Sequence, residues 1–207
     1  MAHDYNSQDI KILEGLEAVR VRPGMYIGST GPKGLHHILW EIVDNAIDEA
    51  ANGFADKVEV VLYKDGSVSV EDNGRGIPTD IHKQAGVSGV QVVFTQLHAG
   101  GKFNNENYSF SGGLHGVGAS VTNALSEWLE VEVYNKTIYK MRFHSYYDKT
   151  RKKMISGEPE EPLQNTRIKT DKHGTFVRFK PDKDVFETVE FSLETIAKRL
   201  RELAFLN

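Results

Sequence analysis

The stretch GLHHILWEIVDNAIDEAA, residues 34–51, carries a strong helical pattern. On a wheel of about 100° per residue, its apolar side chains cover one side and its polar side chains the other. The apolar side holds Leu35, Leu39, Ile42, Val43, Ala46, Ile47 and Ala50, and the polar side holds His37, Glu41, Asp44, Asn45, Asp48 and Glu49. The pattern predicts a helix from about Gly34 to Ala51 that ends at Asn52-Gly53.

Four carboxylates share the polar side of this helix, and no Lys or Arg occurs between Gly34 and Asn52. A solvated helix face usually mixes both signs of charge, because like charges at i, i+4 cost a few tenths of a kcal/mol each. The stripe therefore favours a cation or a basic partner over a bare solvated surface. His37 and Glu41 could also hold a metal, but zinc is the weaker reading because no second His stands at HExxH spacing.

The rest of the chain alternates short helices with strands. A helical period starts near Asp9 and stops before Arg22-Pro23-Gly24, and two strands, KVEVVLY and SVSVED, flank a Lys64-Asp65-Gly66 turn. Further helices are expected at about 90–98, 118–126 and 192–203, further strands at about 128–134, 138–143 and 175–180, and a surface loop at 149–167. The predicted fold is α+β, a two-layer sandwich of helices on a mixed, mostly antiparallel sheet.

Composition limits the function classes. The chain has 207 residues, no cysteine and a net charge of -4. Disulfides and thiolate zinc sites are excluded, and no broad basic surface for nucleic acid is expected. No apolar run approaches the ~18 residues of a membrane span, and the first residues do not resemble a signal peptide, so the expected location is cytoplasmic.

Glycine clusters bound a polar segment of the chain. GGLHGVGAS, residues 112–120, precedes a predicted helix, and Gly100-Gly101-Lys102 stands at the other end of the segment. Glycine lets backbone N–H groups approach an anion at a helix start, so phosphate is the natural ligand. The order of the glycines excludes the dinucleotide fingerprint, and the absence of GxxxxGK[ST] from the sequence excludes the P-loop. Each cluster alone is equally compatible with a tight turn, whereas both together indicate a lid over about 99–118 that closes on an anionic ligand.

A third motif, DNGRGIP at residues 72–78, follows a predicted strand. Asp, Asn, Gly and Pro are also the usual residues of a plain turn at the end of a strand. The combination of an acidic helix face, an Asp at a strand end and a glycine-bounded lid is much more specific than any one of the three.

Taken together, these motifs resemble the ATP-binding boxes shared by gyrase, Hsp90, histidine kinases and MutL. The matching segments are Glu41-x-x-Asp44-Asn45, Asp72-x-Gly74-x-Gly76, LHAGGKF, GGLHGVGAS and Gly174-Thr175. GLEAVRVRPGMYIGST, NALSEWLEVEVY and RLRELAFLN are most similar to the N-terminal ATPase domains of bacterial type IIA topoisomerase B subunits, namely gyrase B and ParE of topoisomerase IV. The resemblance implies the Bergerat-type fold and ATP with Mg²⁺ as cofactors.

The resemblance also implies a role for individual residues. Glu41 corresponds to the general base, His37 to the residue that holds it, and Asn45 to the Mg²⁺ ligand. Asp72 corresponds to the acceptor of the adenine amino group, Thr175 to its helper, and Arg75 to a residue that lies over adenine and pairs with Glu49. The remaining nucleotide contacts fall on Val70, Gly76, Ile77, Pro78 and Val93 around adenine, and on Lys102, Leu114, His115, Gly116, Val117 and Gly118 around the phosphates.

Partners and departures follow from the same resemblance. An N-terminal arm of about residues 1–15, with Tyr5 and Ile10, corresponds to the segment that reaches a second copy of the B-type chain when ATP binds. Residues 1–207 are expected to form one ATP-binding domain without the transducer domain, and therefore to hydrolyse ATP slowly. The A-type subunit and DNA are expected to contact other domains. ATP-competitive inhibitors are expected ligands, but Asn135 stands where most gyrase B chains have a rim arginine, which puts aminocoumarin binding in doubt. A chaperone-like or mismatch-repair ATP clamp of the same superfamily is the alternative function.

Overall fold

The computed structural model describes residues 15–97 and 118–207. Its helices are α1 Leu16–Val21, α2 Gly24–Ile27, α3 Pro32–Ala51, α4 Gly89–Thr95, α5 Ala119–Ala124 and α6 Leu193–Leu206. Its strands are β1 Val58–Leu62, β2 Val68–Asp72, β3 Ser126–Asp148, β4 Lys153–Pro159 and β5 Gln164–Pro181. None of the helices within these ranges is long and apolar enough to cross a membrane.

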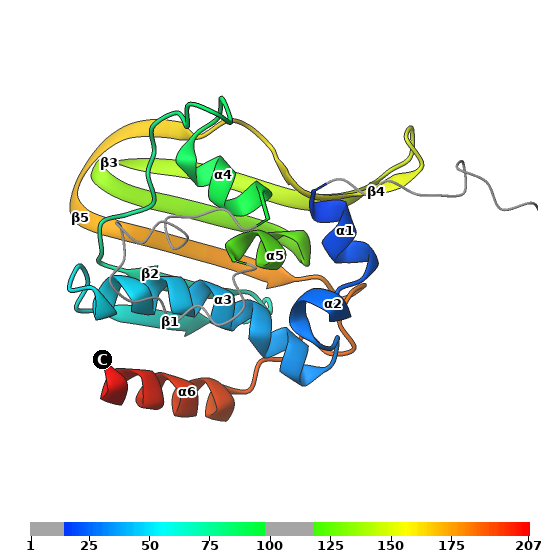
Figure 1. Cartoon of the computed structure of the whole chain (residues 1–207), viewed down its shortest axis with the longest axis horizontal. Helices are drawn as coiled ribbons and strands as arrows, with labels where there is room; N and C mark the ends of the chain where they lie inside the picture. The colour runs from blue at the N-terminus through cyan, green and yellow to red at the C-terminus, as the bar shows by residue number, and fades with distance from the viewer. Residues whose placement is uncertain (1–14, 98–117) are drawn as a thin grey trace, which may run out of the picture.

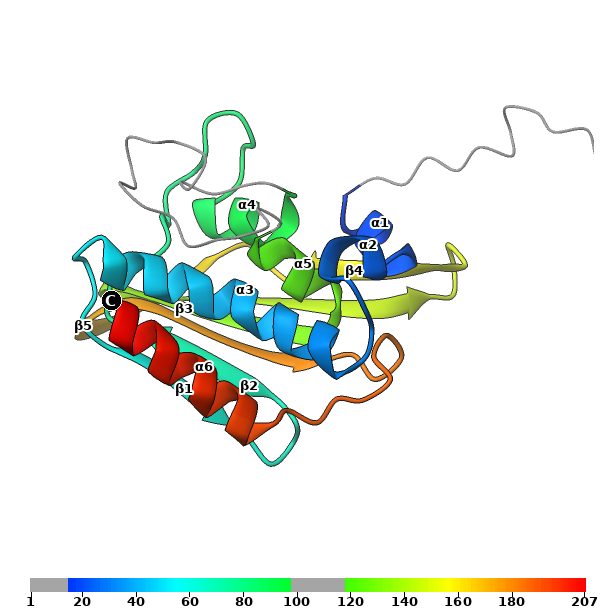
Figure 2. The ribbon, with the colours of Figure 1, turned by 60° about the horizontal axis from the view of Figure 1, so that its bottom comes forward.

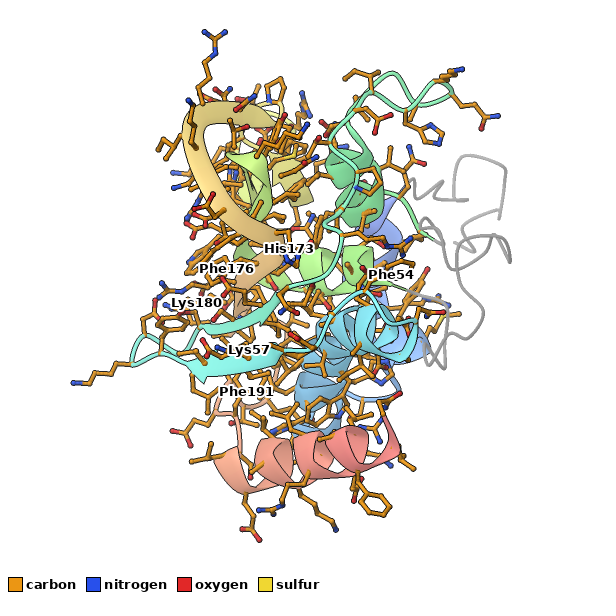
Figure 3. All side chains as sticks on the ribbon, turned by 90° about the vertical axis from the view of Figure 1, so that its left-hand side faces the viewer. Phe54, Lys57, His173, Phe176, Lys180 and Phe191 are labelled. Atoms are coloured by element: carbon orange, nitrogen blue, oxygen red, sulfur yellow. The ribbon has the colours of Figure 1, made fainter. Side chains whose placement is uncertain are left out.

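The strands form one sheet in the order β1-β2-β5-β3-β4, and every pairing between the described strands is antiparallel. Helices α3, α4 and α5 cover one face of this sheet, and α6 lies beside α3 along the β1 edge (Figures 1 and 2). Along β5, Val177 and Phe179 are buried in the core, while Phe176 and Lys180 lie on the side away from α3 (Figure 3). The predicted two-layer α+β fold is confirmed.

Strand β3 folds back on itself. Lys140 Nζ lies 3.1 Å from Glu132 Oε1, and Arg142 pairs with Glu130. A straight strand would separate Glu132 and Lys140 by about 26 Å. The bend falls at Lys136, whose φ is 63°. The two predicted strands at 128–134 and 138–143 are therefore the two arms of β3.

The prediction of a surface loop at 149–167 is wrong. Residues Lys153–Pro159 form β4, which pairs with the end of β3, and β5 begins at Gln164. Charged residues and prolines are tolerated in edge strands, since one side of the strand faces water. The segment resembles a loop in sequence because its charges outnumber the short apolar pair Met154-Ile155.

Several predicted helix limits hold within one to three residues. Helix α1 ends before Pro23 as expected, but the chain resumes at once with the short α2, whose N-cap is Pro23. The start predicted near Asp9 is wrong, because α1 begins at Leu16 after Gly15, whose φ of 60° is not helical. The closing helix predicted from Ser192 begins one residue later, and Ser192 caps α6 by accepting a hydrogen bond from Thr195 N at 3.2 Å.

Buried side-chain hydrogen bonds fix α5 against its neighbours. Thr122 Oγ1 donates to Ile38 O of α3 at 2.7 Å. Asn123 Nδ2 donates to Phe94 O of α4 at 2.9 Å and to Gly157 O of β4 at 3.1 Å. Because these groups are buried, losing one partner would leave a costly unsatisfied polar atom. They hold the start of α5 close to the acidic side of α3.

Candidate functional site

The acidic side of α3 is buried instead of solvated. Glu41, Asp48 and Glu49 are 8%, 1% and 9% exposed. Buried carboxylates need hydrogen-bond partners or ligands, because burial disfavours the charged form. The alternative reading of this stripe as a bare solvated surface is therefore wrong.

Glu41 is held at both carboxylate oxygens. His37 Nε2 lies 3.0 Å from Oε1, one helical turn earlier, and Gly118 N donates to Oε2 at 3.1 Å. Gly118 precedes α5 as its N-cap, so α3 and α5 together set the direction of the carboxylate. Among residues 15–97 and 118–207, no group of three His, Asp or Glu side chains could hold a metal ion.

Asp72 ends β2 at the other end of the site. It is paired with Thr175 across the β2–β5 ladder, and its Oδ1 accepts a hydrogen bond from Gly74 N at 2.8 Å. Burial, aided by the nearby Glu49 charge, raises the pKa of Asp72 to about 6, although the Gly74 hydrogen bond opposes that rise. A buried carboxylate with a raised pKa in such a place is typical of a functional site.

The turn after Asp72 is tied to α3 and β5. Arg75 forms a fork on Glu49, with Nε at 3.2 Å from Oε2 and Nη2 at 2.8 Å from Oε1, and its backbone N donates to Oε2 at 3.0 Å. Ile77 N donates to Thr175 Oγ1 at 3.1 Å. The sequence-based pairing of Arg75 with Glu49 is thus present in the structure.

Two glycines permit this close approach. A Cβ on Gly74 would lie 2.6 Å from Glu49 Oε2. Gly174 has a φ of 117°, and a Cβ there would overlap the carbonyl oxygen of Asp72. Both positions exclude larger residues, so the three segments that carry Glu49, Asp72 and Thr175 can meet.

The other predicted contacts that lie within the described residues divide between the core and the rim. Val70 belongs to the core, Ile77 and Val93 pack against it, Pro78 is exposed, and Gly76 has a positive φ of 82° beside Val133. Asn45 is half-buried one turn after Glu41 on α3. Asn135 is exposed near the bend of β3 and is paired with His173.

Part of the predicted site lies outside the described residues. These positions are Tyr5, Ile10, Lys102, Leu114, His115, Gly116 and Val117. Their contacts remain predictions.

Sequence reasoning missed two side chains at this site, Phe54 and His173 (Figure 3). The Phe54 ring lies under the Arg75 guanidinium, with Cζ 3.7 Å from the ring centroid. His173 Nδ1 lies 3.0 Å from Gly74 O. A signal existed in each case, since Phe54 follows the predicted end of the helix and His173 precedes the Gly174-Thr175 pair.

A groove of about 390 Å³ lies elsewhere, beside the two arms of β3 and the start of β5. Its lysine and arginine are already paired with carboxylates, Lys140 with Glu132 and Arg142 with Glu130 and Glu160. This groove does not include Glu41 or Asp72. The chemistry-bearing side chains gather instead between α3, the end of β2 and the start of α5.

The fold and this arrangement agree with a known class of ATPases. A family model described as histidine kinase-, DNA gyrase B- and HSP90-like ATPase matches residues 30–185. The chain belongs to this family, whose matched region includes α3, the Asp72 turn and Thr175.

Within this family, the chain is similar to individual gyrase B and type 2 topoisomerase B proteins. The chain is 56% identical over 207 residues to the DNA gyrase B protein of Archaeoglobus fulgidus, a match that covers 100% of this chain and 31% of that protein. It is 55% identical over 203 residues to the DNA gyrase B protein of Thermotoga maritima, or 98% of this chain and 30% of that protein. It is 53% identical over 205 residues to the type 2 topoisomerase B protein of Aquifex aeolicus, or 99% and 24%. The chain thus spans less than a third of the length of these relatives.

Proposed function

We propose that this chain is the ATP-binding and hydrolysing domain of a type IIA topoisomerase of the gyrase B kind. In that role, ATP binding closes a dimer of the B-type chains, and closure is coupled to DNA strand passage and supercoiling. The identity to gyrase B relatives along the whole chain supports this proposal over the alternatives. These alternatives are ParE of topoisomerase IV and a chaperone-like or mismatch-repair clamp.

The observation that carries the proposal is the buried Glu41 carboxylate, held between His37 Nε2 at 3.0 Å and Gly118 N at 3.1 Å. A general base must be fixed within reach of the water whose proton it takes. As water oxygen bonds to the γ-phosphorus, Glu41 accepts a water proton, and the bond from phosphorus to the bridging oxygen of ADP breaks. His37 keeps the carboxylate oriented during this step.

The adenine end of the proposed site is Asp72. An ionised carboxylate accepts hydrogen bonds only, which suits the exocyclic amino group of adenine. The Thr175 hydroxyl accepts from Ile77 N beside it, and Val70, Ile77 and Val93 supply apolar surface for the base. A buried acceptor left without its partner is costly, so this arrangement favours adenine over a base that lacks the amino group.

The phosphate end of the proposed site combines an amide ligand with backbone donors. Asn45, one turn beyond Glu41 on α3, offers its side-chain amide oxygen as a metal ligand. Mg²⁺ in phosphate sites typically takes few protein ligands and completes its coordination shell with phosphate oxygens and water. Mg²⁺ would neutralise phosphate charge, while Lys102 and the backbone of residues 114–117 would donate to phosphate oxygens. Gly118, also expected at the phosphates, already donates its N–H to Glu41 Oε2.

Calorimetric titration tests the nucleotide assignment. The Mg²⁺ complex of a non-hydrolysable ATP analogue should bind the wild type and bind Asp72→Asn at least about tenfold more weakly. Asp65→Asn, a change at the turn between β1 and β2, serves as the control. Equal affinity of wild type and Asp72→Asn would remove the adenine assignment.

A further inference from the structure

Phe54 is an exposed aromatic residue at the edge of the proposed nucleotide site. It follows α3 directly after the Asn52-Gly53 turn, and its side chain is outside the hydrophobic core. The residue is 43% exposed, and its backbone N donates to Glu49 O at 2.8 Å. Core packing therefore does not account for a phenylalanine here.

The ring of Phe54 has a specific partner in the Asp72 turn. Arg75 Cζ lies 3.7 Å from the ring centroid, which is a cation–π contact. The edge of the same guanidinium is fixed by two hydrogen bonds to Glu49, at 3.2 and 2.8 Å. The hydrogen bonds to Glu49 thus fix the position of one edge of the guanidinium, and the Phe54 ring packs against one of its faces.

We propose that Phe54 is a positioning residue for nucleobase binding, which supports one face of the Arg75 guanidinium so that the opposite face stacks on adenine. This inference rests on the proposed ATP site. A planar guanidinium can stack on π surfaces through either face, and Phe54 packs on one of them. The Arg75 side chain remains 41% exposed, so it keeps surface available for a ligand.

Glu49 alone would hold Arg75 less well. The fork to Glu49 restrains the edge of the guanidinium through two hydrogen bonds, but it does not pack against a face of the group. The aromatic face adds a contact that is selective for a flat orientation of the guanidinium. Phe54 thereby connects the end of α3 to the stacking surface without touching the nucleotide itself.

The test compares Phe54→Leu with Phe54→Tyr in the intact protein. Leu keeps apolar bulk and loses the π face, whereas Tyr keeps the face. We expect the dissociation constant of the Mg²⁺–ATP analogue to rise about three- to tenfold in Phe54→Leu and to stay within about twofold in Phe54→Tyr. Inorganic tripolyphosphate, used as a competitor, has no base, so its affinity should be the same in both variants.

A double-mutant cycle with Arg75→Gln adds a readout that general destabilisation would not move. Phe54→Leu should have no further effect on ATP-analogue affinity once Arg75 is replaced. Additive losses would overturn the inference, as would unchanged affinity in Phe54→Leu. If the wild type itself fails to bind the analogue, the proposed function fails instead, and the inference with it.

The chain offers a matched control on the open face of the sheet. Arg178 Cζ lies 3.6 Å from the Tyr63 ring centroid, and its Nη2 lies 3.2 Å from Asp65 Oδ2, so this trio has the same chemistry as Phe54, Arg75 and Glu49. Tyr63→Leu should lower thermal stability about as much as Phe54→Leu and leave nucleotide affinity unchanged. An equal loss of affinity in Tyr63→Leu would overturn the positioning role of Phe54.

Discussion

Gly118 N donates a hydrogen bond to Glu41 Oε2 at 3.1 Å and so joins the start of α5 to the acidic side of α3. Gly118 has a φ of 72°, a conformation that favours glycine. The direction of the Glu41 carboxylate thus depends on a residue far along the chain. His37 holds the other oxygen from within α3, and together they leave the carboxylate little freedom.

Replacement of Glu41 should separate binding from turnover. In the full-length protein, Glu41→Ala should keep affinity for the ATP analogue while the turnover number falls by about 10²- to 10⁴-fold, because the general base is lost. Glu41→Gln should have the same defect while it still accepts the Gly118 hydrogen bond. Steady-state phosphate release checks this expectation. Turnover retained in either variant would remove Glu41 from the base role.

Asp72→Asn should stabilise the free protein while it weakens nucleotide binding. The folded-state pKa of Asp72, about 6, is above its ordinary value of 3.8, so ionisation of Asp72 destabilises the folded state. At pH 8 the variant should gain up to roughly 3 kcal/mol in the free energy of unfolding. This gain should shrink as the pH falls from 6 to 4, where the wild type recovers its proton. Urea unfolding across this range provides the measurement, and a gain independent of pH would contradict the assignment.

The pH dependence of nucleotide binding should follow the same group. An ionised Asp72 accepts a hydrogen bond from adenine, so affinity for the ATP analogue should fall as the pH drops through about 6. The phosphates of the ligand also titrate near this pH, so effects that do not involve the base are removed by comparison with tripolyphosphate as competitor. The wild type should lose more affinity for the analogue than for tripolyphosphate. Parallel losses for both ligands would show that Asp72 is not responsible.

His173 should support the adenine turn through its contact with the Gly74 carbonyl, 3.0 Å from Nδ1. The loss of one hydrogen bond at a partly exposed site costs little free energy, so His173→Ala should weaken ATP-analogue binding by only about two- to fivefold. His173→Asn should recover part of this loss, since its amide can donate to the same carbonyl. His82, another loop histidine whose Nδ1 accepts from Ala85 N at 3.2 Å, gives the control variant His82→Ala. Equal effects of both alanine variants would argue against a specific role for His173.

Gly174→Ala should be strongly destabilising. Its φ of 117° is rare for a residue with a side chain, and the added Cβ would overlap Asp72 O. We expect a loss of roughly 3 kcal/mol or more in the free energy of unfolding. Gly66 also has a positive φ, 86°, but no atom within 4 Å of a built Cβ, so Gly66→Ala should cost only about 1 kcal/mol. If chemical denaturation gave similar losses in the free energy of unfolding for the two variants, the close approach of β5 to β2 would not be what excludes a side chain at position 174.

Most elements followed from local patterns in the sequence. The helical period of residues 34–51 and the Asp-Gly turn between β1 and β2 were sufficient to predict those elements, because both signals act over a few residues. The β4 strand was missed because it is a charged edge strand that pairs through its backbone, and such pairing leaves little trace in side-chain polarity. The Phe54 and His173 contacts were missed because each joins segments that are distant in sequence.

The sequence by itself determined the α+β fold, the acidic side of α3 and the residue types of the candidate site, since these depend on periodicity and motif spacing. Only the tertiary structure decided that the acidic side is buried, that Gly118 meets Glu41 and that Thr175 lies opposite Asp72. The physical reason is that burial and long-range hydrogen bonds depend on how α3, α5 and the sheet pack together. The raised pKa of Asp72 arises from that packing, because a carboxylate is desolvated only when other elements cover it.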